Sequence, residues 1–341
     1  MARRARPGPA ELLDGEGAPV GLHLRCLGPE PGPIVCLDAC IDTAPFGDEA
    51  RWSRPPVSGA VADGRLWGRG AADSKMGAAI LAHVVRDLGR SSTIRRGGVD
   101  LLLDADEHTG RFGGARAYLA AVERKPDRAV LGYPDNHEMI RGSRGFHRVR
   151  LQVAGRAGHS GATGGDAVNA IARLARLITA IEAAPLPAEP AGPFAFGPKV
   201  SVTEIAGGEG FSQVPDRAWC SLDMRLTPGF EAAAAARWLD AVVGQQARIE
   251  TVESWPPYVV KESDPLVRAF QAAGSEAFGR AIPLAVCGPS NIGNLFAAHG
   301  IATICGLGVS AENVHGTDEC ALLSSVPAVY RGYFEGVRRF L

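Results

Sequence analysis

Three apolar segments alternate with helical stretches in the first 135 residues, and this alternation constrains the fold most strongly. The segments with the length and composition of buried strands are 34–42, 98–106 and 128–133. Residues 74–88 carry an apolar side chain every four residues, which predicts a helix with one apolar stripe, and a second helix is expected over 113–123. Strands that alternate with helices predict an α/β fold with a parallel-rich sheet flanked by helices.

The pattern changes near residue 145 and returns near 255, after which strands are expected at 284–287 and 302–305. Between these points the order of expected elements is β-α-β-β-α-β, which is typical of a split-βαβ sandwich. The first helix of this order is expected to have Asp166 as its N-cap. We therefore predict an α/β domain formed by residues 1–144 and 255–341, with an inserted α+β domain at 145–254. Residues 1–32 are rich in Gly, Pro and charge and are expected to be an extended or weakly ordered segment.

The charge balance argues against two classes of partner. Lys and Arg number 36 and Asp and Glu 37, so no basic field attracts nucleic acid or an anionic membrane. No stretch approaches the ~18–20 apolar residues of a membrane span. The seven cysteines are scattered in mostly apolar runs, which is typical of reduced thiols in a cytoplasmic protein. We expect a cytoplasmic protein without nucleic-acid or membrane partners.

Polar side chains follow the predicted strands where each strand ends. Cys40 and Asp42 follow the first strand, and Glu107 and His108 follow the second. Asp73 lies in a Gly-rich loop before the first helix. Ligands of open parallel sheets bind beyond the carboxyl ends of the strands, and His, Asp, Glu and Cys are metal ligands. The sequence therefore favours a metal-dependent hydrolase site at this edge.

Five motifs, in this order, resemble the M20 metallopeptidases of the acetylornithine deacetylase, succinyl-diaminopimelate desuccinylase and carboxypeptidase G2 type. They are WGRGAADSK at 67–75, DEHTGRFGG at 106–114, GRAGHSG at 155–161, VPDRA at 214–218 with DMR at 223–225, and HGTDE at 315–319. The resemblance runs from about residue 34 to 335. It implies a zinc-exopeptidase-like catalytic domain with two zinc ions and an inserted lid or dimerisation domain. It also implies hydrolysis of an amide bond next to a carboxylate.

Three of the five metal-ligand positions depart from the family pattern. The family usually has His-x-Asp after the first strand, Asp-Glu-Glu after the second, and Glu or Asp before Pro after the third. This chain has Cys40, His108 and Tyr133 at the ligand positions of those motifs, and only Asp73 and His315 are unchanged. The resemblance assigns two further roles, Glu107 as general base and Asp42 as the aspartate beside a ligand.

The substituted ligands predict a site with one divalent ion. Asp73, His108 and His315 offer a carboxylate and two imidazoles, which suit zinc, with cobalt or manganese as other options. The second position would combine Cys40 and Asp73 with Tyr133, whose phenol has an ordinary pKa of ~10 and is a poor ligand. We expect the second metal site to be weak or empty. Metal-activated water with Glu107 as base would then cleave the amide.

The resemblance also predicts substrate contacts and a partner. His159 matches a residue that reaches across the dimer to the oxyanion, and Arg225 is expected to clamp a substrate carboxylate. Gln213, Ser290 and Asn291 are expected to line the pocket. The predicted substrate is an N-acyl amino acid or a small peptide, and the protein is expected to be a homodimer through the inserted domain.

Simpler interpretations remain open. Asp73 could be a helix N-cap, Cys40 a buried thiol and Tyr133 a wall of the pocket. Asp135 and His137 lie close enough in sequence to Tyr133 to replace it as ligands. At the level of function, the alternatives are a metal-independent enzyme that reuses the same pocket and a catalytically inactive, ligand-binding dimer.

Overall fold

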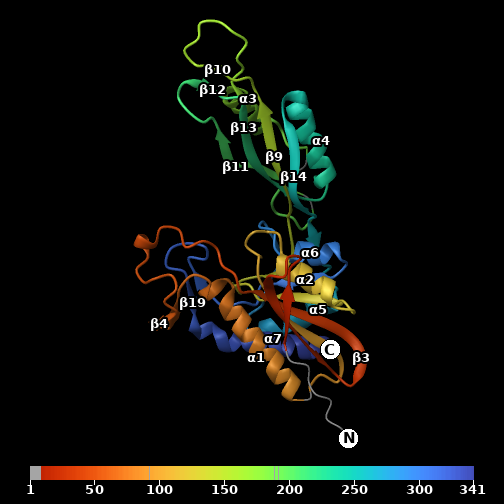
Figure 1. Ribbon diagram of the computed structural model, residues 1–341. Coiled ribbons are helices and arrows are strands. Elements are labelled where there is room, and N and C mark those ends of the chain that lie inside the picture. Colours follow the sequence, from red (N-terminus) through yellow and green to blue (C-terminus); the bar gives the residue numbers. More distant parts are fainter. Residues whose placement is uncertain (1–8, 92, 188, 191) are drawn as a thin grey trace. The chain divides into compact units, whose positions relative to one another are not determined.

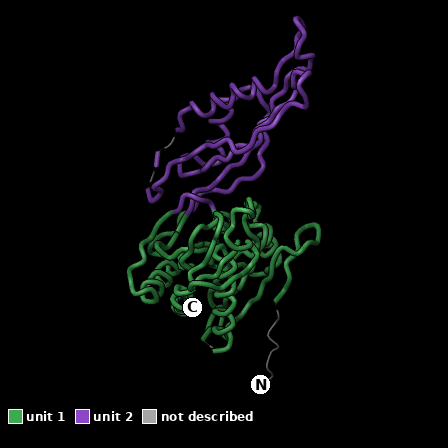
Figure 2. The backbone as a smooth tube through the Cα atoms, turned by 90° about the vertical axis from the view of Figure 1, so that its left-hand side faces the viewer, with its two compact units in different colours: residues 1–142, 259–286, 291–341 green, residues 143–258, 287–290 purple. Residues whose placement is uncertain are grey.

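The computed structural model describes residues 9–91, 93–187, 189–190 and 192–341. The chain forms two compact units (Figure 2). Unit 1 comprises residues 1–142, 259–286 and 291–341, and unit 2 comprises residues 143–258 and 287–290. The roles of catalytic domain and lid, with boundaries at 145 and 254, stay predictions.

Unit 1 is built on a mixed sheet of nine strands (Figure 1). The strands are β1 (Ala10–Leu13), β2 (Pro19–Leu27), β3 (Glu30–Cys40), β6 (Arg96–Asp104), β7 (Arg128–Leu131), β8 (Met139–Ser143), β15 (Tyr258–Val259), β16 (Leu284–Cys287) and β17 (Ala302–Cys305). Their order is β1-β2-β6-β3-β7-β17-β8-β15, with β16 beside β8. The central strands β6, β3, β7 and β17 run parallel, as their continuous apolar sequences predict.

Five helices accompany this sheet in the described part of unit 1. They are α1 (Met76–Arg90), α2 (Gly113–Ala121), α5 (Pro265–Phe278), α6 (Gly293–Ala298) and α7 (Val326–Phe340). Helix α1 packs on β3 and β6 through its predicted apolar stripe, in which Ile80, Val84 and Leu88 are buried, and it also contacts α7. Helix α2 packs on β1, β2 and β6. None of the helices in the described ranges is both long and hydrophobic enough to span a membrane.

A small second sheet of unit 1 brings two loops together. It contains β4 (Ala60–Ala62), β5 (Arg65–Trp67), β18 (Ala311–Glu312) and β19 (Cys320–Leu322) in the order β18-β19-β5-β4. Trp67 lies opposite Cys320 in the antiparallel pair β5–β19. This register places the loop after residue 67 beside the loop before residue 320, although about 250 residues separate them in sequence.

The N-terminal segment differs from the expectation of a weakly ordered stretch. Strands β1 and β2 pair with each other, and β2 continues the sheet antiparallel to β6. Arg25 on β2 donates to the buried carboxylate of Asp100 on β6 at 2.6 Å, and His23 lies 3.4 Å from the same group. These long-range ion pairs order the segment despite its polar composition. Residues 1–8 of the predicted segment lie outside the described residues.

Unit 2 is a four-stranded antiparallel sheet with two helices packed on one face. The strands are β9 (Gly145–Ala154), β11 (Lys199–Gly207), β13 (Arg217–Leu226) and β14 (Arg248–Trp255), in the order β11-β13-β9-β14. Helices α3 (Ala170–Ala183) and α4 (Ala232–Val243) bury an apolar core with the sheet. The short strands β10 (Gly158–His159) and β12 (Gln213–Val214) form a separate pair.

Helix α3 begins later than Asp166, the residue that the sequence suggests as its N-cap. The N-cap is Asn169, whose side-chain oxygen accepts from the backbone N–H of Ala172 at 3.0 Å. Asp166 instead forms an ion pair with Arg156. Asn and Asp are almost equally good N-caps, so local sequence did not separate the two positions.

Candidate metal centre

The candidate centre lies where the parallel strands of unit 1 end. Cys40 is the last residue of β3 and lies opposite Asp104, the last residue of β6. The loops that follow these two strands carry Asp42 and the pair Glu107 and His108. The carboxyl ends of adjacent parallel strands share one edge, so residues far apart in sequence come together there.

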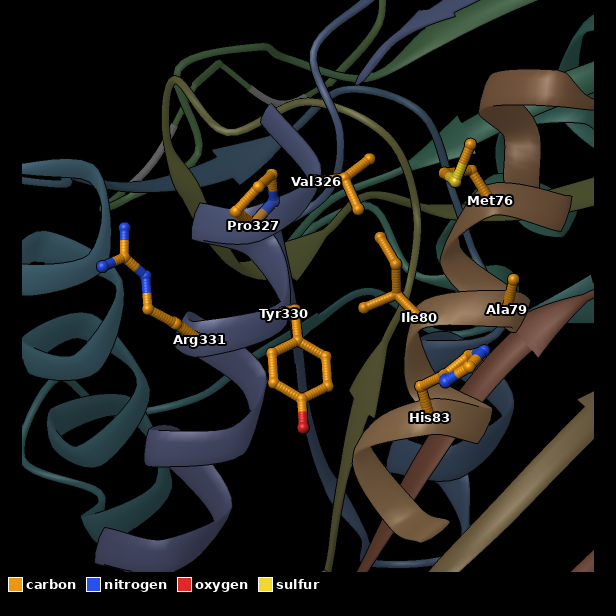
Figure 3. Close-up of a pocket in the computed structure, with 8 residues that line it drawn as sticks. All are labelled: Met76, Ala79, Ile80, His83, Val326, Pro327, Tyr330 and Arg331. Atoms are coloured by element: carbon orange, nitrogen blue, oxygen red, sulfur yellow. The ribbon is translucent and has the colours of Figure 1, made fainter. Parts of the chain in front are cut away.

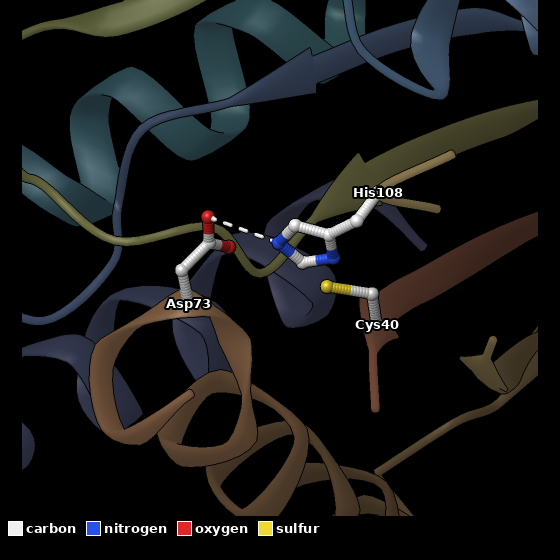
Figure 4. A group of neighbouring side chains, drawn as sticks. All are labelled: Cys40, Asp73 and His108. Atoms are coloured by element: carbon white, nitrogen blue, oxygen red, sulfur yellow. Dashed lines mark ion pairs between the residues drawn. The ribbon is translucent and has the colours of Figure 1, made fainter. Parts of the chain in front are cut away.

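Three predicted ligands form one compact group (Figure 4). The ligand atoms of Cys40, Asp73 and His108 all lie within 4.8 Å of one another. His108 Nε2 lies 3.8 Å from Asp73 Oδ2. His315 joins through the same carboxylate, with its Nε2 2.9 Å from Asp73 Oδ2. The two imidazole rings lie 5.2 Å apart, so the predicted set of one carboxylate and two imidazoles converges.

The donor set suits a divalent ion. Both ring nitrogens of His108 are buried, and the carboxylate oxygens of Asp42, Asp73 and Glu107 lie 3.4–3.8 Å from them. A buried imidazole with a carboxylate oxygen 3.8 Å from its Nε2 and a thiol in the same group is suited to coordination. Carboxylate oxygen, imidazole nitrogen and thiolate sulfur are all ligands of zinc.

The electrostatics of the group favour a cation. Burial acts to lower the pKa of His108, but the carboxylates of Asp42, Asp73 and Glu107 outweigh it and raise that pKa to about 10. Burial acts to raise the pKa of Asp73, but its contacts with His108 and His315 hold it well below the usual range. Protons therefore balance the negative charge when no other cation is bound, and a metal would have to displace them.

Asp42 supports His108 rather than Cys40. The backbone N–H of His108 donates to Asp42 Oδ2 at 3.1 Å, and the same oxygen lies 3.4 Å from Nδ1 of the ring. From the sequence, Asp42 has no ligand imidazole to orient, because Cys40 replaces the usual His. In the structure the imidazole of His108, the predicted ligand, lies at that position. Carboxylates beside ligand imidazoles fix their orientation and tautomer.

Glu107 lies beside this group with a tyrosine as its hydrogen-bond partner. The hydroxyl of Tyr133 donates to Glu107 Oε1 at 2.9 Å. Burial raises the pKa of Glu107, and the nearby Asp73 carboxylate adds to this effect. Burial also raises the pKa of Tyr133 well above its usual value, so the phenol stays neutral. A neutral phenol that donates to the predicted base is poorly suited to act as an anionic metal ligand.

Two other predicted residues pair directly in unit 2. His159 lies opposite Gln213 in the β10–β12 pair. The backbone N–H of Gly161 donates to His159 Nδ1 at 3.0 Å, which fixes the exposed ring. Pairing across antiparallel strands puts both side chains on the same face of the ribbon.

Arg225 and Ser290 also meet within unit 2. Arg225 Nη1 donates to Ser290 Oγ at 3.1 Å, and Arg225 Nε donates to Asp223 Oδ1 at 2.8 Å. Asn291 belongs to unit 1 and is buried, and its side-chain oxygen accepts from the backbone N–H of Gly293 at 2.8 Å. The substrate-binding roles of these residues stay predictions.

Comparison with known proteins places the chain in a family. The sequence matches the family description of peptidase family M20/M25/M40 over residues 36–338. The chain belongs to this family. The resemblance predicted from the five motifs is thereby confirmed.

Individual M20 relatives match over different lengths. The succinyl-diaminopimelate desuccinylase of Alkalilimnicola ehrlichii is 27% identical over 323 residues, which cover 91% of this chain and 84% of that protein. The one from Rhodospirillum centenum is 34% identical over 132 residues, or 36% of this chain. This match spans only 34% of the length of the Rhodospirillum protein. The acetylornithine deacetylase of Yersinia pseudotuberculosis is 33% identical over 116 residues, covering 34% of this chain and 29% of that protein.

Solved structures of M20 proteins share the fold. The metallo-carboxypeptidase Sso-CP2 from Sulfolobus solfataricus superposes with a TM-score of 0.80 at 17% identity. The match covers 97% of this chain and 90% of the Sso-CP2 chain. The aminopeptidase PepT from Bacillus cereus gives a TM-score of 0.71 at 18% identity, with coverages of 97% and 88%. The predicted fold class is confirmed.

Sequence reasoning missed Arg144, which lies beside the Arg225 group of this M20 chain. Its guanidinium donates to the carbonyls of Gly288 at 2.9 Å and Gly197 at 2.8 Å. The backbone carbonyl of Arg144 accepts from Ser290 Oγ at 2.7 Å. Burial lowers the pKa of Arg144, and the positive charge of Arg225 lowers it further. The two guanidinium groups are thus close enough for their charges to interact, with the Asp223 carboxylate paired to Arg225. A lone Arg at the start of a strand carries no sequence signal for this role.

A groove of about 760 Å³ lies elsewhere on unit 1, between α1 and α7 (Figure 3). Its lining is mainly apolar and includes Ile80, Val326 and Pro327, with Tyr330 and Arg331 on the α7 side. None of the predicted site residues lines it, so it is distinct from the candidate metal centre.

Proposed function

We propose that this protein is a cytoplasmic metal-dependent amidohydrolase that cleaves an N-acyl amino acid or a small peptide. The observation that carries the proposal is the convergence of Asp73, His108 and His315, with the Glu107 carboxylate beside them. Family membership supports it, as do the names of the matched relatives, a desuccinylase and a deacetylase of amino-acid derivatives.

Asp73, His108 and His315 would hold one divalent ion, for which zinc is the best chemical match, with Cys40 as a further donor. When bound, the ion supplies Lewis-acid polarisation of the substrate carbonyl and of water. A second ion at Cys40 and Tyr133 is disfavoured, because the Tyr133 hydroxyl is neutral and engaged with Glu107.

Glu107 would act as general base and then as general acid. Its raised pKa brings it nearer to neutral pH, where a base accepts and returns a proton most effectively. The Tyr133 hydrogen bond holds Oε1, and Oε2 lies 3.5 Å from His108 Nδ1, so the carboxylate is fixed beside a ligand. Glu107 would take a proton from water and pass it to the leaving amine.

The substrate carboxylate would bind at Arg225. The nearby Arg144 guanidinium and the Ser290 hydroxyl support this proposal, because together they form a polar, cationic patch. His159 would donate to the oxyanion, and Gln213 and Asn291 would line the substrate site, as the family resemblance implies.

We also propose that unit 2 mediates a homodimer. Strand β11 is an edge of its sheet, residues 203–207 along it are exposed, and Ile205 is 56% exposed. Exposed edge strands are templates for pairing with another chain. Light scattering is expected to give a dimer for the wild type and a monomer for Ile205→Lys. A wild-type monomer would contradict the proposal.

A substrate screen tests the proposed reaction. Protein purified without chelator is assayed with N-succinyl and N-acetyl amino acids and dipeptides, with zinc, cobalt or manganese added. We expect hydrolysis of at least one class, loss of activity with EDTA, and recovery with metal. Glu107→Gln is expected to keep the metal and lose turnover. Activity that survives EDTA would favour the metal-independent alternative.

A further inference from the structure

A fully buried carboxylate, Glu319, lies directly behind the Asp73 loop. Its Oε1 accepts the backbone N–H groups of Gly70 at 3.0 Å, Ala72 at 3.1 Å and Asp73 at 3.2 Å. Its Oε2 accepts from Arg69 Nη1 at 2.6 Å. One carboxylate therefore fixes the backbone of the loop that presents Asp73.

The partner of Glu319 extends this support to two other loops. Arg69 is only 7% exposed, and its Nη2 donates to the carbonyl of His315 at 3.1 Å. Its Nε donates to the carbonyl of Pro45 at 3.2 Å, three residues after Asp42. The Arg69–Glu319 pair thus connects the loops that carry Asp42, Asp73 and His315.

The loop that carries His315 needs such support, because two of its residues have backbone conformations that are unfavourable on their own. His315 has φ of 63° and Asp318 has φ of 59°, in the left-handed region that residues with a Cβ seldom adopt. Such conformations persist only where surrounding contacts determine them. The planar guanidinium fork suits this task, since it donates in several fixed directions at once.

We propose that Arg69 and Glu319 are positioning residues of the metal centre. They hold Asp73 and His315 at the separation that one divalent ion requires, without touching the ion or the substrate. The inference rests on the proposed function. It predicts that substitution of Arg69 or Glu319 lowers the affinity for the metal and changes the affinity for the substrate little.

Substitution of Glu319 and substitution of Arg69 remove different parts of this ion pair. Glu319→Gln keeps an oxygen acceptor but sets an amide N–H₂ or a neutral oxygen against Arg69, which leaves a buried charge without its partner. Arg69→Lys keeps the positive charge but loses the fork that reaches both His315 and Pro45. A shared effect of the two variants therefore reports on the geometry that the pair maintains.

The test is zinc affinity measured by competition with a chromophoric chelator, together with kcat and KM. We expect Glu319→Gln and Arg69→Lys to bind zinc ~10–100-fold more weakly, the range for groups that orient ligands. We expect kcat at fixed low zinc to fall while KM changes little, and excess zinc to restore part of kcat. Circular dichroism verifies that each variant is folded.

The matched controls are Arg25→Lys and Asp100→Asn. Arg25 and Asp100 form another ion pair of unit 1 with a fully buried carboxylate and a 2.6 Å contact, on the strands β2 and β6. We expect these controls to lower stability and to leave zinc affinity unchanged.

Two results would overturn the inference while the proposed function stands. The first is unchanged zinc affinity in folded Glu319→Gln and Arg69→Lys. The second is an equal loss of affinity in Arg25→Lys, because that would show a general effect of stability. A wild-type protein that binds no zinc would overturn the proposed function as well.

Discussion

Asp38 on β3 and Asp104 on β6 are fully buried, and they make stability depend on pH. Asp38 lies opposite Leu102 in the parallel pair, so Asp104, two residues further, has its side chain on the same face. The two carboxyl groups interact with each other and are shielded from solvent. Burial raises the pKa of Asp38 to about 8, and burial with the charge of Asp38 raises the pKa of Asp104.

The size of the effect follows from proton linkage. In the unfolded chain Asp38 loses its proton near the ordinary aspartate pKa of 3.8, whereas the folded protein keeps that proton up to about pH 8. The pKa is raised on folding, so the contribution to stability is complete at low pH and is lost as pH rises through this window. One proton changes the free energy of unfolding by ~1.4 kcal/mol per pH unit.

Replacement of Asp38 by Asn removes this titration and keeps the shape of the side chain. We expect the free energy of unfolding of Asp38→Asn, relative to wild type, to increase by ~1.4 kcal/mol per pH unit, or ~3 kcal/mol between pH 5 and 7. Urea unfolding at pH 5, 6 and 7 with EDTA measures it without a contribution from metal. Asp63→Asn, the same change at an exposed carboxylate, controls for the substitution itself. A difference that is constant over this pH range would refute the reasoning.

Two further predictions concern packing and substrate binding. A Cβ added at Gly77 would lie 2.0 Å from the carbonyl oxygen of Gly132, so Gly77→Ala should lower the free energy of unfolding by ~1–3 kcal/mol. Gly15→Ala, which meets nothing within 4 Å, should not change it, and a thermal unfolding midpoint equal in both variants would contradict the packing argument. Arg144→Ala should raise KM for a carboxylate substrate ~10-fold or more with little change in kcat. The reason is that the proposed attraction between the Arg144 guanidinium and the substrate carboxylate is the same in the ground state and in the transition state. Arg176→Ala, an exposed change on α3, is its control, and an unchanged KM in Arg144→Ala would count against the anion site.

Much of the fold is encoded in local patterns. The sequence predicts β16 at Leu284–Cys287 and β17 at Ala302–Cys305 with their observed ends, and α1 within two residues. Continuous apolar runs and a period of four are signals that short windows contain. Strand β2 was not recognised, because what orders it is the ion pair of Arg25 with the buried Asp100, 75 residues away.

The residues of the candidate site could be predicted from the sequence, but the long-range contacts that hold them in place could not. Polar residues at strand ends pointed to Cys40 and His108, because sheet topology brings strand ends together. The family resemblance added Asp73 and His315 to the set. The supports of that set were not predictable. Glu319 acts on backbone N–H groups about 250 residues away. In the separate Arg225 group, Arg144 was missed for the same reason. Such contacts leave no spacing pattern in the chain.

The metal content of the protein tests the central claim most directly. Elemental analysis of wild type, purified without chelator and equilibrated with zinc, is compared with Asp73→Asn. We predict about one tightly held ion per wild-type chain and a large loss in the variant, since Asp73 contacts both imidazoles. A wild type that holds no ion, or a variant that retains the wild-type content, would contradict the account.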